Sequence, residues 1–274
     1  MPQPVRSIPS ALFSLIFPDN CRLCEAPLKA ISRIPVCPAC LAKPQPLNAE
    51  FFCVSCRTPF LNEHPLDSEG LCALCRLGLN GFDAAYSFGL YETELRQLIH
   101  LFKYGRVQTL AKPLGRLLVS ALPREEHFDL IVPMPMHWLR RWQRGFNQAD
   151  LLARELGRRT HLTVRHAVRR VHHKRAQAGL TNSKRRLNVQ GAFRVKNASA
   201  IRGKRILLID DVMTTGATAS ACARVLKRAG AAHISLLTVG RVDRRIANID
   251  PATESAAVST FPGSFEHAES GSFA

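Results

Sequence analysis

Two adjacent carboxylates followed by a short Thr/Gly stretch are the residues of this chain best suited to chemistry. Asp210 and Asp211 end the apolar run 206–209, and the residues VMTTGAT at 212–218 come directly after them. An Ala-rich segment with a helical pattern follows. Carboxylates accept hydrogen bonds from a sugar diol, while hydroxyls and backbone N–H groups at the start of a helix bind phosphate. This order of residues therefore predicts a site for a phosphorylated sugar.

The whole stretch closely resembles the phosphoribosyl pyrophosphate (PRPP) motif of type I phosphoribosyltransferases. A strand-to-helix turn with an Asp cap is the plainer interpretation, but it leaves most of the string unexplained. The resemblance implies that Asp210 and Asp211 are the catalytic pair that holds the ribose hydroxyls. The implied PRPP-binding set consists of Asp210, Asp211, Val212, Met213, Thr214, Thr215, Gly216, Ala217 and Thr218.

Four cysteine doublets form a second group of chemically capable residues. Eight of the nine cysteines lie in Cys-x-x-Cys pairs, namely Cys21/Cys24, Cys37/Cys40, Cys53/Cys56 and Cys72/Cys75. Two thiolates three positions apart clamp one edge of a tetrahedral metal, and two such turns complete a four-sulfur shell. We expect two structural zinc ions, one from the first two doublets and one from the last two, although four doublets can be joined in three ways.

Disulfides, a redox-active pair and an iron–sulfur cluster are the alternatives to zinc. Disulfides need an oxidising compartment, and a redox Cys-x-x-Cys usually occurs once, on a thioredoxin-like unit. Iron–sulfur clusters also take four cysteines, but regular doublets favour zinc. Cys222, in the expected helix after the Thr/Gly stretch, is interpreted as a buried packing residue.

Strands and helices alternate along the rest of the chain, which predicts an α/β fold with a parallel sheet flanked by helices. Expected strands cover 84–91, 128–136, 206–209 and 234–239, and expected helices cover 92–102, 110–122, 148–159 and 219–229. Asn147 is positioned to cap the third of these helices. The strand at 206–209 is apolar at every position, as in a strand covered on both faces, and its carboxyl end should open on the ligand crevice.

Positive charge is concentrated in one quarter of the chain. The formal net charge is +17, and residues 140–205 alone hold 19 Lys and Arg against two acidic residues. This excess favours an anionic partner, either nucleic acid, pyrophosphate or both, over a merely solvated basic surface. Arg140, Arg144 and Lys103 are the candidates for pyrophosphate, because guanidinium groups bind phosphate oxygens bidentately. Residues 164–195 are predicted to form a mobile basic flap or hairpin that ends at Ala192 and Phe193.

Several separated motifs in the right order resemble the ComF family of predicted amidophosphoribosyltransferases. They are the Cys doublets, FKY at 102–104, VPMP at 132–135, RGFNQ at 144–148, then Gln177, Leu180, Arg185 and Asn188 ahead of Ala192 and Phe193, and the PRPP motif. The resemblance implies a PRPP-binding domain behind a zinc module, in bacterial cytoplasm, with a link to DNA uptake in natural competence. The Arg and His enrichment at 171–175 departs from the family pattern.

These observations divide the chain into three parts. Residues 1–80 are predicted to form a short helix at 9–17 and a Cys-rich double zinc ribbon, residues 81–243 a type I phosphoribosyltransferase domain with a basic flap, and 244–274 a disordered tail. The helix at 9–17 is expected to pack on its own protein, with a membrane surface as the alternative. No apolar run approaches the ~20 residues of a membrane span. The N-terminus has no signal-peptide layout, so we expect a cytoplasmic protein.

Two functions fit these features. The first is an enzyme that binds PRPP with Mg²⁺, held chiefly by the substrate's own oxygens, and transfers the phosphoribosyl group to an amine with release of pyrophosphate. No residue stands out as its general base. The second is a non-catalytic, PRPP-sensing accessory protein that binds single-stranded DNA together with DNA-import proteins. The aromatic residues of 140–205 are few, which favours the first function over the second.

Overall fold

The structure is a computed structural model, and it describes residues 20–28, 33–78, 80–138, 142, 144–171 and 191–242. Four expectations lie outside the described residues. They are the helix at 9–17, Arg140, the central part of the flap at 172–190 with Gln177, Leu180, Arg185 and Asn188, and the tail at 244–274.

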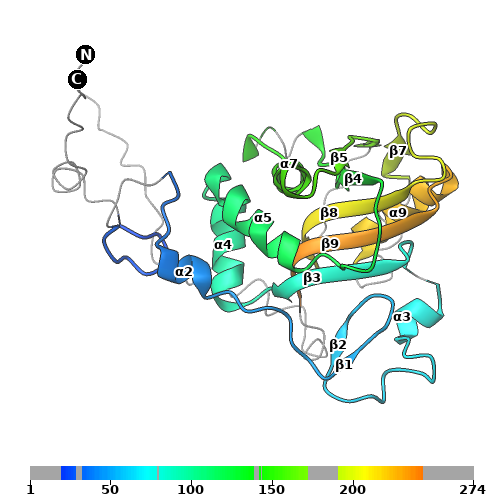
Figure 1. The fold of residues 1–274 in the computed structure, drawn as a ribbon, viewed down its shortest axis with the longest axis horizontal. Helices are drawn as coiled ribbons and strands as arrows, with labels where there is room; N and C mark the ends of the chain where they lie inside the picture. The colour runs from blue at the N-terminus through cyan, green and yellow to red at the C-terminus, as the bar shows by residue number, and fades with distance from the viewer. Residues whose placement is uncertain are drawn as a thin grey trace, which may run out of the picture.

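A five-stranded parallel sheet forms the centre of the molecule (Figure 1). Its strand order is β3-β9-β8-β4-β5, and every neighbouring pair is parallel. The strands are β3 (Ala84–Leu90), β4 (Leu130–Pro133), β5 (Thr163–Val164), β8 (Arg205–Met213) and β9 (His233–Arg241). The parallel α/β sheet predicted from the sequence is therefore confirmed.

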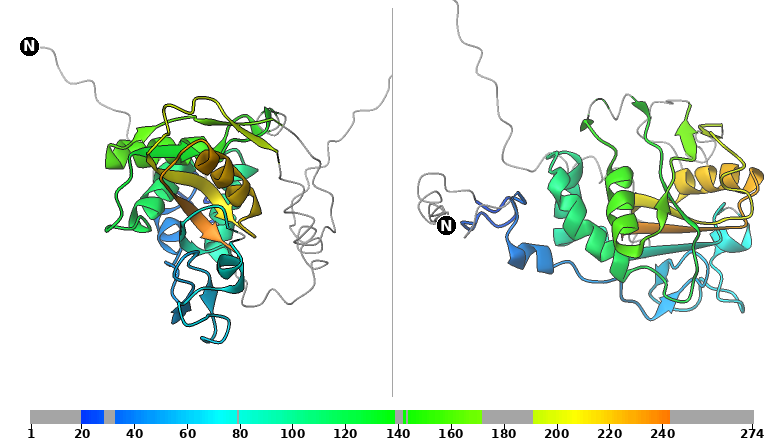
Figure 2. Two further views of the ribbon diagram at one scale, coloured as in Figure 1. Left: turned by 90° about the vertical axis from the view of Figure 1, so that its right-hand side faces the viewer. Right: turned by 45° about the horizontal axis from the view of Figure 1, so that its top comes forward.

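Helices cover both faces of this sheet (Figure 2). One face carries α4 (Thr93–Lys103), η1 (Gln108–Leu110), α5 (Ala111–Ser120) and α7 (Gln148–Thr160), and the other carries α9 (Ala217–Arg228). Alternate residues of a strand point to opposite faces. Leu207 and Ile209 of β8 accordingly lie in the core under α4, α5 and α7, whereas Ile206 and Leu208 lie in the core under α9.

Local sequence signals account for where these helices form. The apolar spacing predicted for α4 places Leu95, Leu98, Ile99 and Phe102 in the core, each at most 3% exposed. Asn147 caps α7 as expected, since its side chain accepts a hydrogen bond from the backbone N–H of Ala149 at 3.2 Å. The helix expected at 219–229 begins two residues earlier, directly after Gly216.

Strand β8 is longer than the sequence predicted. The expected strand ended at residue 209, with both aspartates beyond it, but β8 continues through them to Met213. The reason is its partner, because β9 pairs with β8 up to the register Met213–Arg241. The two aspartates therefore lie within the strand rather than in the turn that follows it.

The Cys-rich region contains four short elements that contact opposite faces of the sheet. They are α2 (Pro38–Ala42), β1 (Phe51–Phe52), β2 (Pro59–Phe60) and α3 (Ala73–Arg76). Cys21 and Cys40 belong to the core under α4, α5 and α7, whereas Cys53, Cys56 and Cys72 belong to the core under α9. The chain passes from one face to the other between residues 40 and 53 (Figure 1).

A short hairpin lies at the base of the expected flap. Strands β6 (Val168–Arg170) and β7 (Phe193–Val195) are antiparallel, and Val168 and Phe193 are buried in the core that includes α9. The predicted end of the flap at Ala192 and Phe193 thus coincides with the start of β7.

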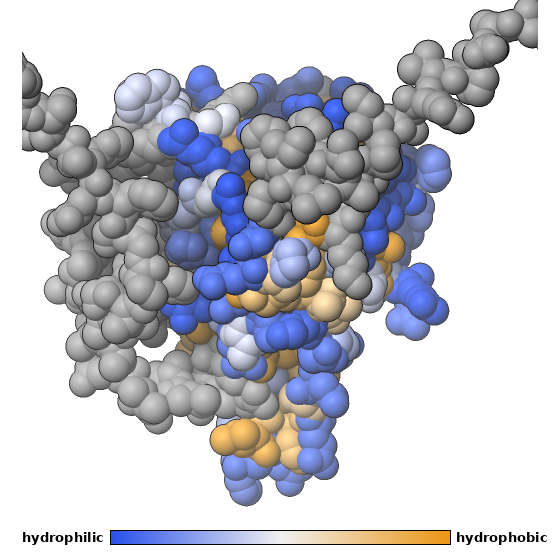
Figure 3. Space-filling view, turned by 90° about the vertical axis from the view of Figure 1, so that its left-hand side faces the viewer, coloured by the Kyte–Doolittle hydropathy of each residue, from blue (hydrophilic) through white to orange (hydrophobic). Residues whose placement is uncertain are grey.

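Several apolar side chains around the last two Cys doublets are exposed. Val54, Leu61 and Leu77 are 58%, 73% and 70% exposed. Figure 3 shows apolar surface among hydrophilic residues in the lower part of the molecule, where β1 and β2 lie in Figure 1. Among the described residues, no helix combines the length and the apolar composition that crossing a bilayer requires.

Candidate ligand and metal sites

The edge of β8 that faces β4 is open at its carboxyl end. Pairing between β4 and β8 ends at Pro133 and Ile209, where the N–H of Met134 donates to the carbonyl of Ile209 at 2.8 Å. On its other edge, β8 stays paired with β9 to its last residue. From β4 the chain proceeds to β5, and from β8 it proceeds to β9 on the opposite side. A reversal of this kind creates a ligand crevice at the carboxyl ends of two parallel strands.

Asp211 lies at this edge and forms an ion pair with the last residue of α4. The Lys103 Nζ is 2.9 Å from Asp211 Oδ1, and the two side chains are 14% and 13% exposed. Burial by itself would lower the pKa of Lys103, but the charge of Asp211 and its hydrogen bond raise that pKa overall. Lys103 is therefore held in its charged form beside Asp211 in the protein without ligand.

Asp210 lies next to this pair in a less favourable setting for a negative charge. Burial raises the pKa of Asp210 to about 7, and the charge of Asp211 acts in the same direction. Lys103 and a hydrogen bond from the backbone N–H of Asp211, at 2.9 Å, oppose this rise. Asp210 is thus divided between its neutral and charged forms near neutral pH, which suits a group that exchanges hydrogen bonds with a sugar diol.

The residues after Asp211 fall into three structural classes. Val212 and Met213 finish β8, Thr214 to Gly216 form a turn, and Ala217 and Thr218 begin α9. We call residues 213–217 the anion turn. The Thr214 side chain is exposed, and the hydroxyl of Thr215 accepts a hydrogen bond from the N–H of Ala217 at 3.3 Å. The first turn of α9 supplies N–H groups that the helix itself cannot pair.

Gly216 is required by the geometry of the anion turn. Its φ is +72°, a left-handed conformation that other residues seldom adopt. A Cβ at this position would also lie 3.0 Å from the Met213 Cε atom. A larger residue would therefore strain the backbone at the point where N–H groups are presented, so we regard Gly216 as the residue that shapes the turn.

Two of the three residues predicted to bind pyrophosphate are described: Lys103 is the last residue of α4, and Arg144, which precedes α7, contacts Tyr104 directly after α4. The Arg144 guanidinium lies 4.9 Å from the ring centroid of Tyr104, and its Nη2 is 3.3 Å from the Tyr104 hydroxyl. The rings of Phe102 and Phe146 pack nearby with centroids 5.6 Å apart. Lys103 contacts Asp211 rather than standing free, and Arg140 lies outside the described residues.

Two further residues of the site were missed in the sequence. Arg170, at the end of β6, lies close enough for its charge to oppose the raised pKa of Asp210. Its position among many arginines gave no signal that set it apart. Tyr104 was noted only as part of FKY at 102–104, and the stacking of Arg144 on its ring depends on the fold.

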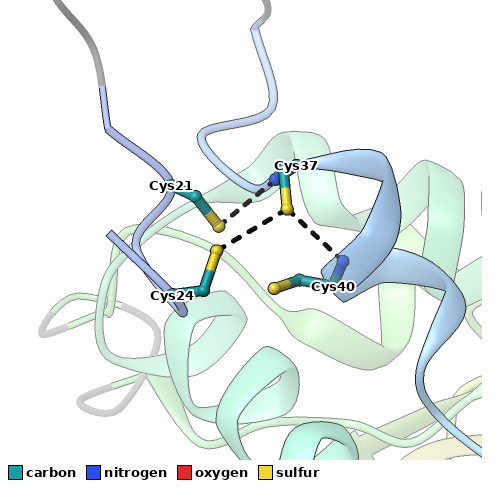
Figure 4. Close-up of side chains that lie close together, drawn as sticks. All are labelled: Cys21, Cys24, Cys37 and Cys40. Atoms are coloured by element: carbon teal, nitrogen blue, oxygen red, sulfur yellow. Dashed lines mark hydrogen bonds between the residues drawn. The ribbon is translucent and has the colours of Figure 1, made fainter. Parts of the chain in front are cut away.

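The first cysteine group brings together four sulfur atoms from two turns (Figure 4). Its members are Cys21, Cys24, Cys37 and Cys40, whose Sγ atoms all lie within 4.8 Å of one another. The N–H of Cys37 donates to the Cys21 Sγ at 3.3 Å, and Cys24 and Cys37 have their sulfurs 3.8 Å apart. Cys24 is exposed to solvent, so one side of this group is open.

The second cysteine group is more deeply buried. Its members Cys53, Cys56, Cys72 and Cys75 also have all Sγ atoms within 4.8 Å, and the first three are buried. Asn80 Nδ2 donates to the Cys75 Sγ at 3.1 Å. Four sulfurs at this spacing fit a tetrahedral Zn²⁺ in both groups, and the pairing of the doublets expected from the sequence is confirmed.

The raised pKa of Asp210 predicts an unusual dependence of stability on pH. The folded state holds this proton more tightly than the unfolded chain, where the pKa is about 3.9, so Asp210 should reduce stability as pH rises from about 4 to about 7. Asp210→Asn keeps the hydrogen-bond acceptor and removes the charge. We expect the variant to be about 1–2 kcal/mol more stable than the parent at pH 8 and nearly equal at pH 4, as measured by urea unfolding.

Asp129→Asn is the matched control, with the opposite sign. The backbone N–H of Arg205 donates to Asp129 at 2.8 Å and lowers the pKa of that carboxyl, so its removal should reduce stability at pH 8. Identical pH profiles for Asp210→Asn and the parent protein would show that burial does not raise the pKa of Asp210.

Comparison with known proteins places this site in a described domain family. The phosphoribosyl transferase domain family matches residues 143–268, a range that contains β8 and the anion turn. Competence protein F of Haemophilus influenzae is 34% identical over 170 residues, which cover 58% of this chain and 73% of that protein. DNA utilization protein YhgH of Escherichia coli strain K12 is 30% identical over 229 residues, which cover 81% of this chain and 96% of that protein.

Further similar proteins include one more curated relative and two solved structures. Competence protein ComFC of Bacillus subtilis is 33% identical over 84% of this chain and 88% of its own length. Adenine phosphoribosyltransferase of Saccharomyces cerevisiae is 15% identical, with a TM-score of 0.32 over 55% of this chain and 78% of that chain. Orotate phosphoribosyltransferase of Mycobacterium tuberculosis is 16% identical, with a TM-score of 0.31 over 61% and 84%.

In this chain two four-cysteine groups precede a parallel sheet whose central strand ends in the Asp-Asp and Thr/Gly segment. Because relatives at 30–34% identity are covered over more than two thirds of their length, the chain belongs to the ComF family, with Competence protein F, ComFC and YhgH, and it contains a phosphoribosyl transferase domain.

Proposed function

We propose that this protein binds PRPP with Mg²⁺ in the crevice beside β8 and transfers its phosphoribosyl group to an amine, releasing pyrophosphate. One observation carries the proposal. Asp210 and Asp211 lie on the open edge of β8, and the anion turn leads directly from them into α9. The carboxylates suit the ribose hydroxyls, and the N–H groups and hydroxyls that follow suit the 5′-phosphate.

The transfer exchanges one bond at the anomeric carbon of the ribose. The bond from that carbon to the pyrophosphate oxygen breaks, a bond to the amine nitrogen forms, and the proton that the amine loses passes to the released pyrophosphate. Positive charge develops on the sugar, where Asp210 and Asp211 stabilise it, and negative charge develops on pyrophosphate, where Lys103, Arg140 and Arg144 are proposed to act. Mg²⁺ that entered with the substrate, held mainly by its phosphate oxygens, would further neutralise the leaving group.

The ion pair between Lys103 and Asp211 fits a change of partners on binding. Asp211 accepts from Lys103 in the protein without ligand, at 2.9 Å. Ribose hydroxyls that donate to Asp211 would take over part of this role, leaving Lys103 near a highly charged anion. Because the Lys103 Nζ is already largely buried, its interaction with that anion would be strong.

Zinc and location complete the proposal. We propose that each four-cysteine group holds one structural zinc ion, supported by the sulfur positions, and that the protein works in the bacterial cytoplasm, where thiols stay reduced. We retain the division into a Cys-rich segment at 1–80 and a phosphoribosyltransferase domain at 81–243. The names of the relatives support a link to DNA uptake or DNA utilisation.

Calorimetry with PRPP and Mg²⁺ tests the proposed ligand. We expect heat of binding with the parent protein and a loss of affinity of more than about 100-fold in the double variant Asp210→Asn, Asp211→Asn, because at least two charge-assisted hydrogen bonds are lost. Asp129→Asn changes a carboxylate at the opposite end of the sheet and should bind normally. If the parent protein shows neither heat of binding nor thermal stabilisation at millimolar PRPP, this function is excluded.

A screen of amine acceptors that follows pyrophosphate release tests transfer separately from binding. Release that depends on the acceptor and disappears in the double variant supports an enzyme. Binding without release from any acceptor supports the alternative, a non-catalytic PRPP-sensing protein that also binds single-stranded DNA.

One observation favours that alternative. Trp138 and Trp142 are 70% and 79% exposed in the connection between β4 and α7, and Tyr104 is 58% exposed beside Arg144. Exposed aromatic rings with neighbouring cations are typical of surfaces on which unpaired bases stack. The positive charge of residues 140–205 would add contacts to the phosphate backbone.

Binding of a single-stranded oligonucleotide across a salt series tests this alternative. We expect affinity to fall with increasing salt, and Trp142→Ala to weaken binding by about 5- to 150-fold through the loss of one stacked base. The double variant of Asp210 and Asp211 should bind the oligonucleotide as the parent does. An affinity that does not change with salt concentration would contradict binding through phosphate contacts.

Metal analysis tests the two zinc sites. We expect two equivalents of zinc per chain, and one equivalent in either Cys24→Ser or Cys75→Ser, since each variant removes one ligand of one group. Cys222→Ser, a buried cysteine outside both groups, is the control and should retain two. Acid should release the metal, because protons compete for the thiolates. Zinc-free protein isolated under reducing conditions would argue against this assignment.

A further inference from the structure

A buried arginine connects the second cysteine group to the strand beside the proposed ligand site. Arg241 is the last residue of β9 and is only 1% exposed. Its Nη1 donates to the carbonyls of Cys56 and Arg57 at 2.9 and 2.7 Å, and its Nη2 donates to the Thr58 hydroxyl at 2.8 Å. The guanidinium from β9 thus holds residues 56–58, which follow the Cys53–Cys56 doublet directly.

Thr58 extends this connection to a sulfur atom. Its hydroxyl lies 2.9 Å from the Cys56 Sγ while it accepts from Arg241. If the Cys56 sulfur binds a metal as a thiolate, it has no proton to give, and the Thr58 hydroxyl would then donate to it while accepting from Arg241. Since a Zn²⁺ with four thiolates has a net charge of −2, a metal-loaded second group would place negative charge one hydroxyl away from the buried cation.

The backbone of Arg241 lies at the carboxyl end of the sheet, where the ligand site is proposed. It pairs in register with Met213, the first residue of the anion turn, and the N–H of Val242 donates to the Met213 carbonyl at 2.9 Å. Its own carbonyl accepts from the N–H of Tyr91 at 2.7 Å. Movement of Arg241 would therefore move the strand end that carries the anion turn.

The other doublet of this group, which includes Cys75, is connected to the anion turn through the segment 80–82. Asn80 donates to the Cys75 Sγ. The next two residues, Gly81 and Phe82, pack against α9 and the residue that precedes it. A Cβ on Gly81 would lie 2.3 Å from the carbonyl oxygen of Ser220, which shows how closely this backbone approaches α9. The ring of Phe82 comes within 3.6 Å of the Cβ position of Gly216.

The first cysteine group has a different environment. Cys21 and Cys40 pack in the core under α4, α5 and α7, and the Thr109 hydroxyl donates to the carbonyl of Arg33, which lies in the sequence between the two doublets. The hydrogen bonds of Arg241 and Asn80 described above go to the second cysteine group and not to the first. The two groups have the same doublet spacing but different connections to the sheet.

We propose that the second cysteine group, with its metal, is a structural part of the ligand pocket, and that Arg241 is the positioning residue that couples them. Metal binding at Cys53, Cys56, Cys72 and Cys75 orders the anion turn, and a phosphorylated ligand in that turn strengthens metal retention. Coupling between two sites is reciprocal, so each effect must accompany the other. The proposal deepens the proposed function and rests on it only where PRPP is the probe.

Hydrogen exchange of the ligand-free protein tests the coupling without PRPP. We expect Cys75→Ser to accelerate amide exchange at residues 213–217 by about tenfold or more, and Cys24→Ser to leave it unchanged. Arg241→Met should reproduce the effect of Cys75→Ser on the anion turn, and Arg241→Lys should restore part of the protection because the charge remains. Equal exchange in the parent, Cys75→Ser and Arg241→Met would overturn the proposal.

Zinc release tests the reciprocal effect. In Cys24→Ser only the second group retains its ion, so transfer to a zinc-selective chelator reports that group alone. Saturating PRPP with Mg²⁺ should slow release by about 5- to 150-fold, the range typical of coupled sites, and Arg241→Met should abolish this dependence. Release that is unaffected by bound PRPP would overturn the coupling while leaving the proposed function intact.

The two tests also separate the two proposals. If PRPP fails to bind the parent protein, the proposed function is wrong, and the exchange experiment still decides whether the second group orders the anion turn. If Cys75→Ser does not fold, the Arg241→Lys and Arg241→Met pair gives the same comparison in proteins that keep all eight ligands.

Discussion

The pairing of the carboxyl ends of β8 and β9 is the constraint on which the rest of this structure depends. It extends β8 through both aspartates to Met213 and sets the start of the anion turn. On the other edge β4 leaves after Pro133, so that the same strand end is rigid on one side and open on the other. A ligand at this edge would meet polar groups that the sheet already holds in place, which lowers the entropy lost on binding.

Charge balance within the crevice follows from that pairing. Two adjacent carboxylates in a poorly hydrated strand end cannot both ionise without cations nearby. Lys103 neutralises Asp211 directly, and Arg170 acts on Asp210 from β6. These cations come from α4 and from the base of the expected flap, on either side of β8. PRPP carries hydroxyls that can donate to the aspartates and phosphates that can pair with the cations. Its binding would therefore exchange one set of charge partners for another.

Local sequence patterns predicted the parts of the fold that local interactions determine. The apolar run at 206–209 identified the central strand, Asn147 identified the start of α7, and the doublet spacing identified both cysteine groups. The full length of β8 could not be predicted, because it depends on a partner strand that follows a helix. The same holds for the contact of Arg241 with Thr58, which joins residues 183 positions apart. Nothing in the neighbours of either residue indicates the other.

The different settings of the two cysteine groups explain why the second is more than an appended module. Strands β1 and β2 have two residues each, and a hairpin of that size is not stable alone. Yet Cys53, Cys56 and Cys72 are buried in the same core as α9 and the sheet. Four cysteines from two turns, with Arg241 contacting one doublet and Asn80 the other, would supply with a bound metal the cross-links that so short a hairpin lacks. The group packs on the α9 face of the fold, and Arg241 connects it to the paired end of β8 and β9 that bears the aspartates.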